Sequence, residues 1–158
     1  MLSNPEEKQK TSFERGKQNS LISEEYVKNK YGIKVDEYEP LDSMKRRVEV
    51  KSCQLILKDR FDSSFRKGIF ILRKHQHDFI LKSNGNYIFV LMYQSKVVAD
   101  IRCKASEVQH LIEWDSTEHC KIPWSEVIPY TSAFEFLKQA PPAELIATGS
   151  FAQKMLRG

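Results

Sequence analysis

The sequence is poor in cysteine and contains no long hydrophobic run. Its three cysteines, Cys53, Cys103 and Cys120, form no C-x-x-C pair, so we expect no disulfide framework and predict a reducing, cytoplasmic location. No apolar stretch approaches the roughly 20 residues that a membrane helix needs, and the polar N-terminus lacks the core of a signal peptide. We therefore expect neither a disulfide-stapled secreted module nor a membrane partner.

Glycine-rich phosphate loops are also missing. None of the six glycines falls in the spacing of a P-loop or of a Rossmann dinucleotide site, and there is no internal repeat. With 41% hydrophobic and 29% charged residues, the composition is globular rather than disordered. We expect one domain over residues 1–158, with a polar N-terminal arm at 1–17 and a C-terminal extension at 115–158.

The spacing of apolar residues predicts a layered fold. A helix capped by Asn19 or Ser20 is expected to end at Tyr31, because Gly32 stands in the usual terminating position. The other expected elements, in order, are strands over 33–38 and 48–57, a polar loop over 58–67, a strand over 68–72, a helix over 74–83, strands over 87–93 and 96–101, and helices over 106–114 and 132–139. This order is typical of an α/β or α+β fold with a mixed sheet.

Positive charge gathers in one part of the chain. Residues 44–75 hold ten basic and three acidic side chains, a net charge of +7, whereas residues 110–158 carry a net charge of −2. Such a field favours a polyanionic substrate, whose phosphates need neutralising side chains nearby. The alternative is the solvated face of a basic protein.

A short charged motif lies inside this basic region. Asp42 precedes Glu49 by seven positions, and Glu49 and Lys51 alternate with Val48 and Val50 on an expected strand. Charges on an otherwise apolar strand are costly unless they are paired or have a function. Two carboxylates and an ammonium group that converge at a sheet edge can hold a divalent cation and orient a water. The motif thus favours phosphodiester cleavage, the alternative being a plain salt-bridge network.

The Asp42…Glu49-x-Lys51 pattern, followed by Ser-Cys and preceded by a helix with carboxylates, resembles the PD-(D/E)XK nuclease superfamily. That group includes restriction endonucleases, mismatch-repair nicking enzymes and Holliday junction resolvases. Residues 67–79 and 87–90 are similar to the strand–helix–strand continuation of restriction-type members, so the resemblance covers about residues 14–112. It implies a restriction endonuclease-like core, a central mixed β-sheet flanked by helices. The family often has proline directly before the aspartate, whereas Leu41 intervenes here, and Asp36 remains an alternative to Asp42.

The resemblance also implies a metal site. Asp42 and Glu49 would bind one or two Mg²⁺ ions, which Mn²⁺ can replace, and the main-chain carbonyl of Val50 would be a further ligand. Lys51 would lie close to the attacking water and stabilise the negative charge that develops during cleavage.

Members of the family commonly place an acid from the first helix near the metal. Glu24 is preferred over Glu25, because Glu24 shares a helix stripe with Val27 and Tyr31. The alternative is that both acids are solvated and pair with Lys28.

The implied function is a metal-dependent DNA endonuclease, either restriction-type or specific for structures such as Holliday junctions or repair intermediates. A single domain of this size usually needs a second copy to cut both strands, so a homodimer is expected. A nucleic-acid-binding module of nuclease fold that lacks cleavage activity is the alternative from another functional class.

Histidines outside the motif are expected to have a structural or surface role, and aromatic residues there are expected to pack in the core or the sheet. His75 and His77 are two positions apart on the expected helix, which puts them on different faces and argues against a shared metal. Tyr87, Phe89 and Tyr93 alternate along an expected strand, which indicates sheet packing.

Overall fold

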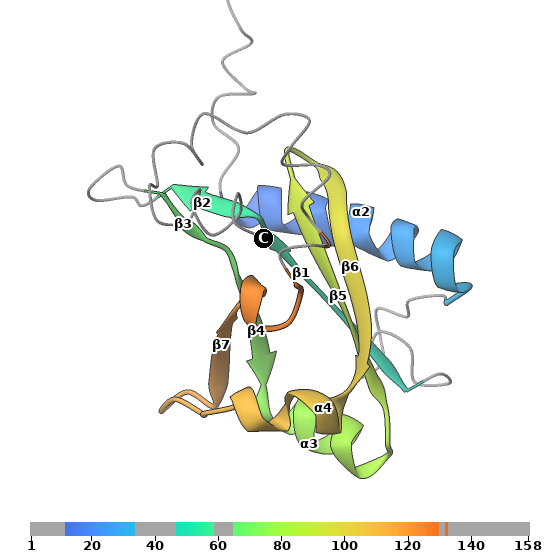
Figure 1. The fold of residues 1–158 in the computed structure, drawn as a ribbon, viewed down its shortest axis with the longest axis vertical. Coiled ribbons are helices and arrows are strands. Elements are labelled where there is room, and N and C mark those ends of the chain that lie inside the picture. The colour runs from blue at the N-terminus through green and yellow to red at the C-terminus, as the bar shows by residue number, and fades with distance from the viewer. Residues whose placement is uncertain (1–11, 34–46, 59–64, 130–131, 133–158) are drawn as a thin grey trace, which may run out of the picture.

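The computed structural model describes residues 12–33, 47–58, 65–129 and 132 (Figure 1). Its elements are the helix α2 (Ser12–Tyr31), strands β1 (Val48–Gln54), β2 (Ile56–Lys58), β3 (Phe65–Lys67) and β4 (Ile69–Arg73), helix α3 (Lys74–Lys82), strands β5 (Asn86–Tyr93) and β6 (Lys96–Lys104), helix α4 (Ala105–Val108), the 3-10 turn η1 (Gln109–Leu111), strand β7 (His119–Pro123) and the 3-10 turn η2 (Trp124–Glu126).

The central sheet has the order β1–β5–β6. Strands β1 and β5 are parallel, and β5 and β6 are antiparallel, so the expected mixed sheet flanked by helices is confirmed. Parallel neighbours need a long crossover, and the segment with β4 and α3 supplies it by carrying the chain back to the start of β1. Strands β2 and β3, and strands β4 and β7, form two small antiparallel pairs.

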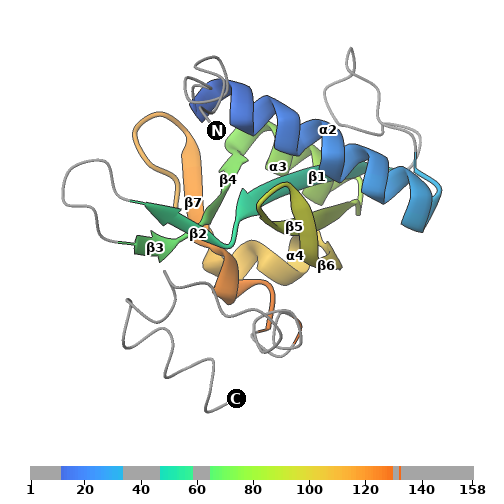
Figure 2. The ribbon, with the colours of Figure 1, turned by 90° about the horizontal axis from the view of Figure 1, so that it is seen from above.

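One face of the central sheet is covered by α2. Figure 2 shows this helix along one side of the sheet, where its buried Val27 packs against aliphatic side chains of β1 and β5: Val48, Val50, Ile88, Val90 and Met92. The helix ends as predicted, because Gly32 takes a positive φ of 68° and its N–H bonds to Lys28 O at 3.0 Å.

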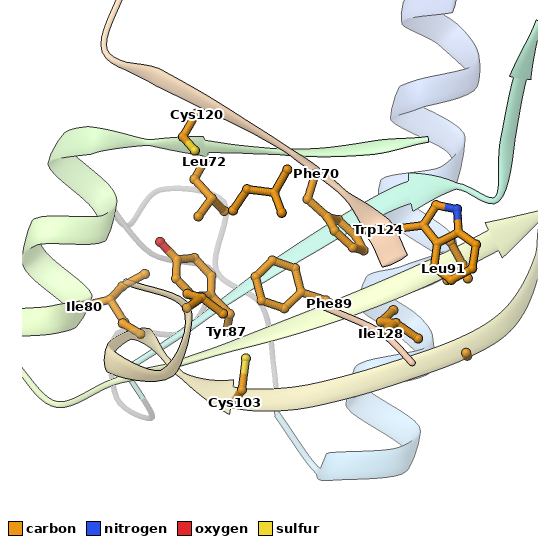
Figure 3. Close-up of a cluster of buried hydrophobic side chains, with 14 of the residues drawn as sticks. Phe70, Leu72, Ile80, Tyr87, Phe89, Leu91, Cys103, Cys120, Trp124 and Ile128 are labelled. Carbon is orange, nitrogen blue, oxygen red and sulfur yellow. The ribbon is translucent and has the colours of Figure 1, made fainter. Parts of the chain in front are cut away.

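The other face of the sheet holds the larger core. Tyr87, Phe89 and Leu91 of β5 pack there against β4, α3, α4 and the segment after β7 (Figure 3). The rings of Phe70 and Phe89 lie 4.8 Å apart in a tilted pair. The expectation that Tyr87 and Phe89 take part in the packing of the sheet is therefore confirmed.

Two glycines lie against the ends of β1. A Cβ atom at Gly68 would come within 1.7 Å of Gln54 O, and one at Gly85 within 2.5 Å of Arg47 O. Side chains cannot occupy such gaps, so glycine is required where the chain passes both ends of this strand. The strand that carries the charged motif is thus held by close backbone contacts.

Several boundaries differ from those expected. Helix α2 begins at Ser12, seven residues before Asn19, and Glu14 in its first turn favours a helix N-terminus there. The expected strand 48–57 breaks at Leu55, whose carbonyl accepts a bond from Trp124 Nε1 at 3.0 Å. Strand β3 occupies part of the expected loop, β7 was not expected, and the expected helix 106–114 shortens to α4 and η1.

Two expected elements, strand 33–38 and helix 132–139, lie almost wholly outside the described residues. Among the residues that are described, no helix has the length and apolar character to cross a membrane.

Candidate active site

Glu49 and Lys51 lie side by side on the same face of β1. In the register of the sheet they are opposite Tyr87 and Phe89, which belong to the larger core. The Glu49 side chain is 7% exposed and that of Lys51 16% exposed, and Lys51 Nζ lies 3.5 Å from Glu49 Oε1. A carboxylate and an ammonium group therefore stand together at low exposure, where charge–charge interactions are stronger than in water.

Gln76 joins this pair from helix α3. Lys51 Nζ donates a hydrogen bond of 3.1 Å to Gln76 Oε1. Sequence reasoning missed this residue, because nothing in the sequence couples positions that lie 25 residues apart. The crossover between the parallel strands β1 and β5 creates the contact by returning the chain to the start of β1.

Tyr87 borders the site from the neighbouring strand. Burial raises the pKa of its hydroxyl, and the negative charge of Glu49 raises it further. The hydroxyl therefore stays protonated at neutral pH. Burial likewise raises the pKa of the Cys53 thiol, which lies farther along β1, so this cysteine is not a thiolate nucleophile.

The remaining predicted residues divide into two groups. Asp42 and its alternative Asp36 lie outside the described residues, so both assignments stay predictions. Glu24 is half-buried on α2, as its place on the packed side of the helix predicted, and Glu25 is exposed. Helix α2 covers the sheet face opposite to that on which Glu49 and Lys51 lie. The role of Glu24 also stays a prediction, as does that of the Val50 carbonyl.

Oxygen donors suit the predicted cation. Within the described ranges, no group of three or more His, Cys, Asp or Glu side chains could hold a metal ion. Glu49 offers one carboxylate of the kind that Mg²⁺ prefers, next to a main-chain carbonyl on the same strand. The chemistry of these donors fits a hard divalent cation, with Asp42 as the predicted second carboxylate.

The histidines of α3 point to different surroundings, as expected. His77 is 1% exposed and uses both ring nitrogens in hydrogen bonds, whereas His75 is exposed. These two side chains therefore do not form a metal pair.

Comparison with known proteins gives a family for this fold and site. A family model described as a PD-(D/E)XK nuclease superfamily domain matches residues 8–129, about three quarters of the chain. Searches of curated proteins and of solved structures gave no significant match. The matched range includes the whole central sheet, with Glu49, Lys51 and Gln76. The chain belongs to the PD-(D/E)XK nuclease superfamily.

Proposed function

We propose that this nuclease-superfamily domain is a Mg²⁺-dependent DNA endonuclease that hydrolyses phosphodiester bonds with a metal-activated water. The observation that carries the proposal is the Glu49–Lys51 pair, a nearly buried carboxylate 3.5 Å from an ammonium group on a strand of the family's sheet. A charge pair at low exposure costs desolvation free energy, so its presence in a core favours a chemical role.

Asp42, Glu49 and the Val50 carbonyl are the proposed ligands of the cation. The chemistry that Mg²⁺ supplies when bound is neutralisation of phosphate charge and a lower pKa for coordinated water, and Mn²⁺ can substitute. Lys51 stabilises the negative charge that develops on the attacking oxygen and the phosphate. Gln76 holds the Lys51 ammonium through their 3.1 Å hydrogen bond and so limits its motion.

DNA is the proposed substrate and a homodimer the proposed working form. The net charge of +7 over residues 44–75 supports a polyanionic partner, since that segment contains the Glu49–Lys51 pair. Two copies would supply one site for each strand. Cys53, Cys103 and Cys120 are free thiols, which supports the proposed cytoplasmic location.

A plasmid-cleavage assay tests the proposal. Supercoiled DNA is incubated with the purified chain in Mg²⁺, in Mn²⁺ and in excess chelator, and nicked and linear products are measured. We expect cleavage with either metal and none with chelator. Lys51→Ala should lower the rate by about 10³-fold, as is typical for loss of one electrostatic transition-state contact. Lys96→Ala, at an exposed lysine at the start of β6, is the matched control and should cleave like the unaltered chain.

The same assay separates the alternatives. Preferential cutting of four-way junctions over linear duplex would assign the activity to the structure-specific type. Tight, salt-sensitive duplex binding without cleavage in either metal would refute the enzymatic proposal and favour a binding module.

A further inference from the structure

A buried hydrogen-bonded network lies directly behind the Glu49–Lys51 pair. His77 Nδ1 is 3.0 Å from the Tyr87 hydroxyl, and His77 Nε2 is 2.6 Å from Gln109 Oε1. An amide oxygen only accepts, so the hydrogen of the imidazole is on Nε2, and Nδ1 accepts from the tyrosine hydroxyl. The network thus links helix α3, strand β5 and the turn η1 through side chains alone.

Ring packing further fixes two residues of the network, His77 and Tyr87. The imidazole of His77 and the ring of Tyr87 are almost parallel, at 9° and 5.8 Å between centroids, and Trp114 lies 5.7 Å from the imidazole. Figure 3 shows Tyr87 between Ile80 of α3 and Phe89 of β5. Both the position and the orientation of the His77 ring are therefore determined by its neighbours.

The network touches the candidate site from two sides. Tyr87 is the register partner of Glu49 on the neighbouring strand. His77 directly follows Gln76, whose side chain accepts the hydrogen bond of Lys51. Helix α3 has only nine residues, and its buried side chains are His77 and Ile80. A helix this short depends on tertiary anchors for its placement, so His77 governs where Gln76 stands.

We propose that Tyr87 and His77 are positioning residues of the nuclease site, which hold α3 so that Gln76 keeps the Lys51 ammonium in place. This inference rests on the proposed function. It goes beyond that function because neither residue touches the substrate: both act through Gln76. Hydrogen-bonded residues that orient a catalytic group in this way typically change activity by about 10- to 100-fold when they are removed.

The first test compares two substitutions in the same core. Tyr87→Phe removes only the hydroxyl, and Ile80→Val removes one methylene from the other buried residue of α3. At a temperature where both variants are folded, we expect Tyr87→Phe to lower kcat about tenfold with an unchanged KM. Ile80→Val should leave kcat within about twofold, because it keeps the network. An equal loss of kcat in both variants would overturn the proposal, since it would show a purely structural role.

A double-mutant cycle tests the route through Gln76. In a Gln76→Ala background, Tyr87→Phe should cause no further loss of kcat, because the group that it positions is gone. A full tenfold loss in that background would overturn the proposal.

A third measurement does not need cleavage and so separates this inference from the proposed function. In nuclear magnetic resonance spectra, Lys51→Met should shift the side-chain amide signal of Gln76, since it removes their hydrogen bond. We expect this shift to disappear when Tyr87→Phe is already present and to persist with Ile80→Val. If the shift is unchanged by Tyr87→Phe, the positioning role fails, whether or not the chain cuts DNA.

Discussion

The two faces of the central sheet use polar side chains in opposite ways. On the α2 face, the carboxylate of Asp100 on β6 accepts hydrogen bonds from Tyr26, Lys30 and Tyr31, and all three donors lie on α2. On the other face, Glu49 and Lys51 come from one strand and meet Gln76 from a different element. The Asp100 cluster joins α2 to the sheet. The Glu49–Lys51–Gln76 cluster brings together side chains from β1 and from the crossover helix α3.

The geometry of the two ion pairs differs accordingly. Lys30 Nζ lies 2.8 Å from Asp100, whereas Lys51 Nζ lies 3.5 Å from Glu49 and shares its hydrogens with Gln76. The Asp100 cluster thus has the short, saturated contacts of a structural anchor. The Glu49–Lys51 pair has a looser geometry, which suits the proposed role, in which a cation, a water and a phosphate would be further partners. From this difference we infer that stability depends on the first cluster and activity on the second.

The largest expected effect comes from neutralising the site pair. The double variant Glu49→Gln with Lys51→Met should lose about 10³-fold in DNA cleavage, because both the proposed metal ligand and the ammonium group are gone. Its free energy of unfolding should stay level or rise, since replacing both members of a buried pair by neutral side chains is often neutral or stabilising. Urea unfolding and plasmid cleavage measure the two quantities. A loss of stability as large as that expected for Asp100→Asn on the α2 face would contradict the distinction between the two faces.

Two glycine substitutions compare the close backbone contact at the end of β1 with the open surface of α2. Gly68→Ala should destabilise the fold by about 3 kcal/mol, because its Cβ would meet Gln54 O at 1.7 Å and the backbone must shift. Gly16→Ala is the matched control on α2, where a Cβ meets nothing within 4 Å. That change should stabilise the helix by about 0.5–1 kcal/mol. Urea unfolding measures both, and two shifts of the same sign would contradict the close approach at β1.

The sequence was most informative where a pattern acts locally. The alternation of Glu49 and Lys51 with valines predicted their common face, and Gly32 marked the end of α2. The spacing of His75 and His77 predicted different faces of the helix, and the structure buries His77 and exposes His75. The first and third of these follow from the period of a strand or a helix, and the second from the positive φ that glycine tolerates.

The contacts that complete the site depend on the fold and could not be predicted in this way. Gln76 meets Lys51 only because β1 and β5 pair in parallel, and His77 meets Gln109 only because α4 and η1 return to α3. The tight passage at Gly68 depends on β4 crossing the end of β1. Such long-range juxtapositions leave no periodic signal, since any polar residue at position 76 would have fitted the helix pattern equally well.

Asp100→Asn should weaken the α2 anchor without changing the site. Burial would raise the pKa of Asp100, but the hydrogen bonds from Lys30, Tyr31 and Tyr26 hold it below its usual value. The substitution should cost about 1–3 kcal/mol at pH 7, as is typical for hydrogen bonds to a charged group. At permissive temperature kcat should be unchanged. A large loss of kcat in the folded variant would mean that the α2 face also shapes the site.

The pH dependence of the same variant has a definite sign. A carboxylate whose folded-state pKa is lowered contributes stability above its unfolded value of about 3.9 and loses it as the pH falls through the folded value. The difference in unfolding free energy between Asp100→Asn and the unaltered chain should therefore be full near neutral pH and shrink below about pH 4. Urea unfolding across this range measures it, and a difference that grows in acid would contradict the role of the ionised carboxylate.

Lys30→Met removes the ammonium group of the anchor but keeps the two tyrosine donors, and it should have the smallest effect. The Lys30 side chain is 48% exposed, so solvent screens its attraction to Asp100, and the expected loss is below about 1 kcal/mol. Tyr26 and Tyr31 still donate to the carboxylate in this variant. The loss should also shrink as salt is raised from 0.05 to about 1 M, because exposed pairs are screened over a few ångströms at high ionic strength. If Lys30→Met costs as much as Asp100→Asn, the anchor depends on the Lys30 ammonium group and not on the tyrosine hydrogen bonds. The two faces would then differ only in where their charges stand.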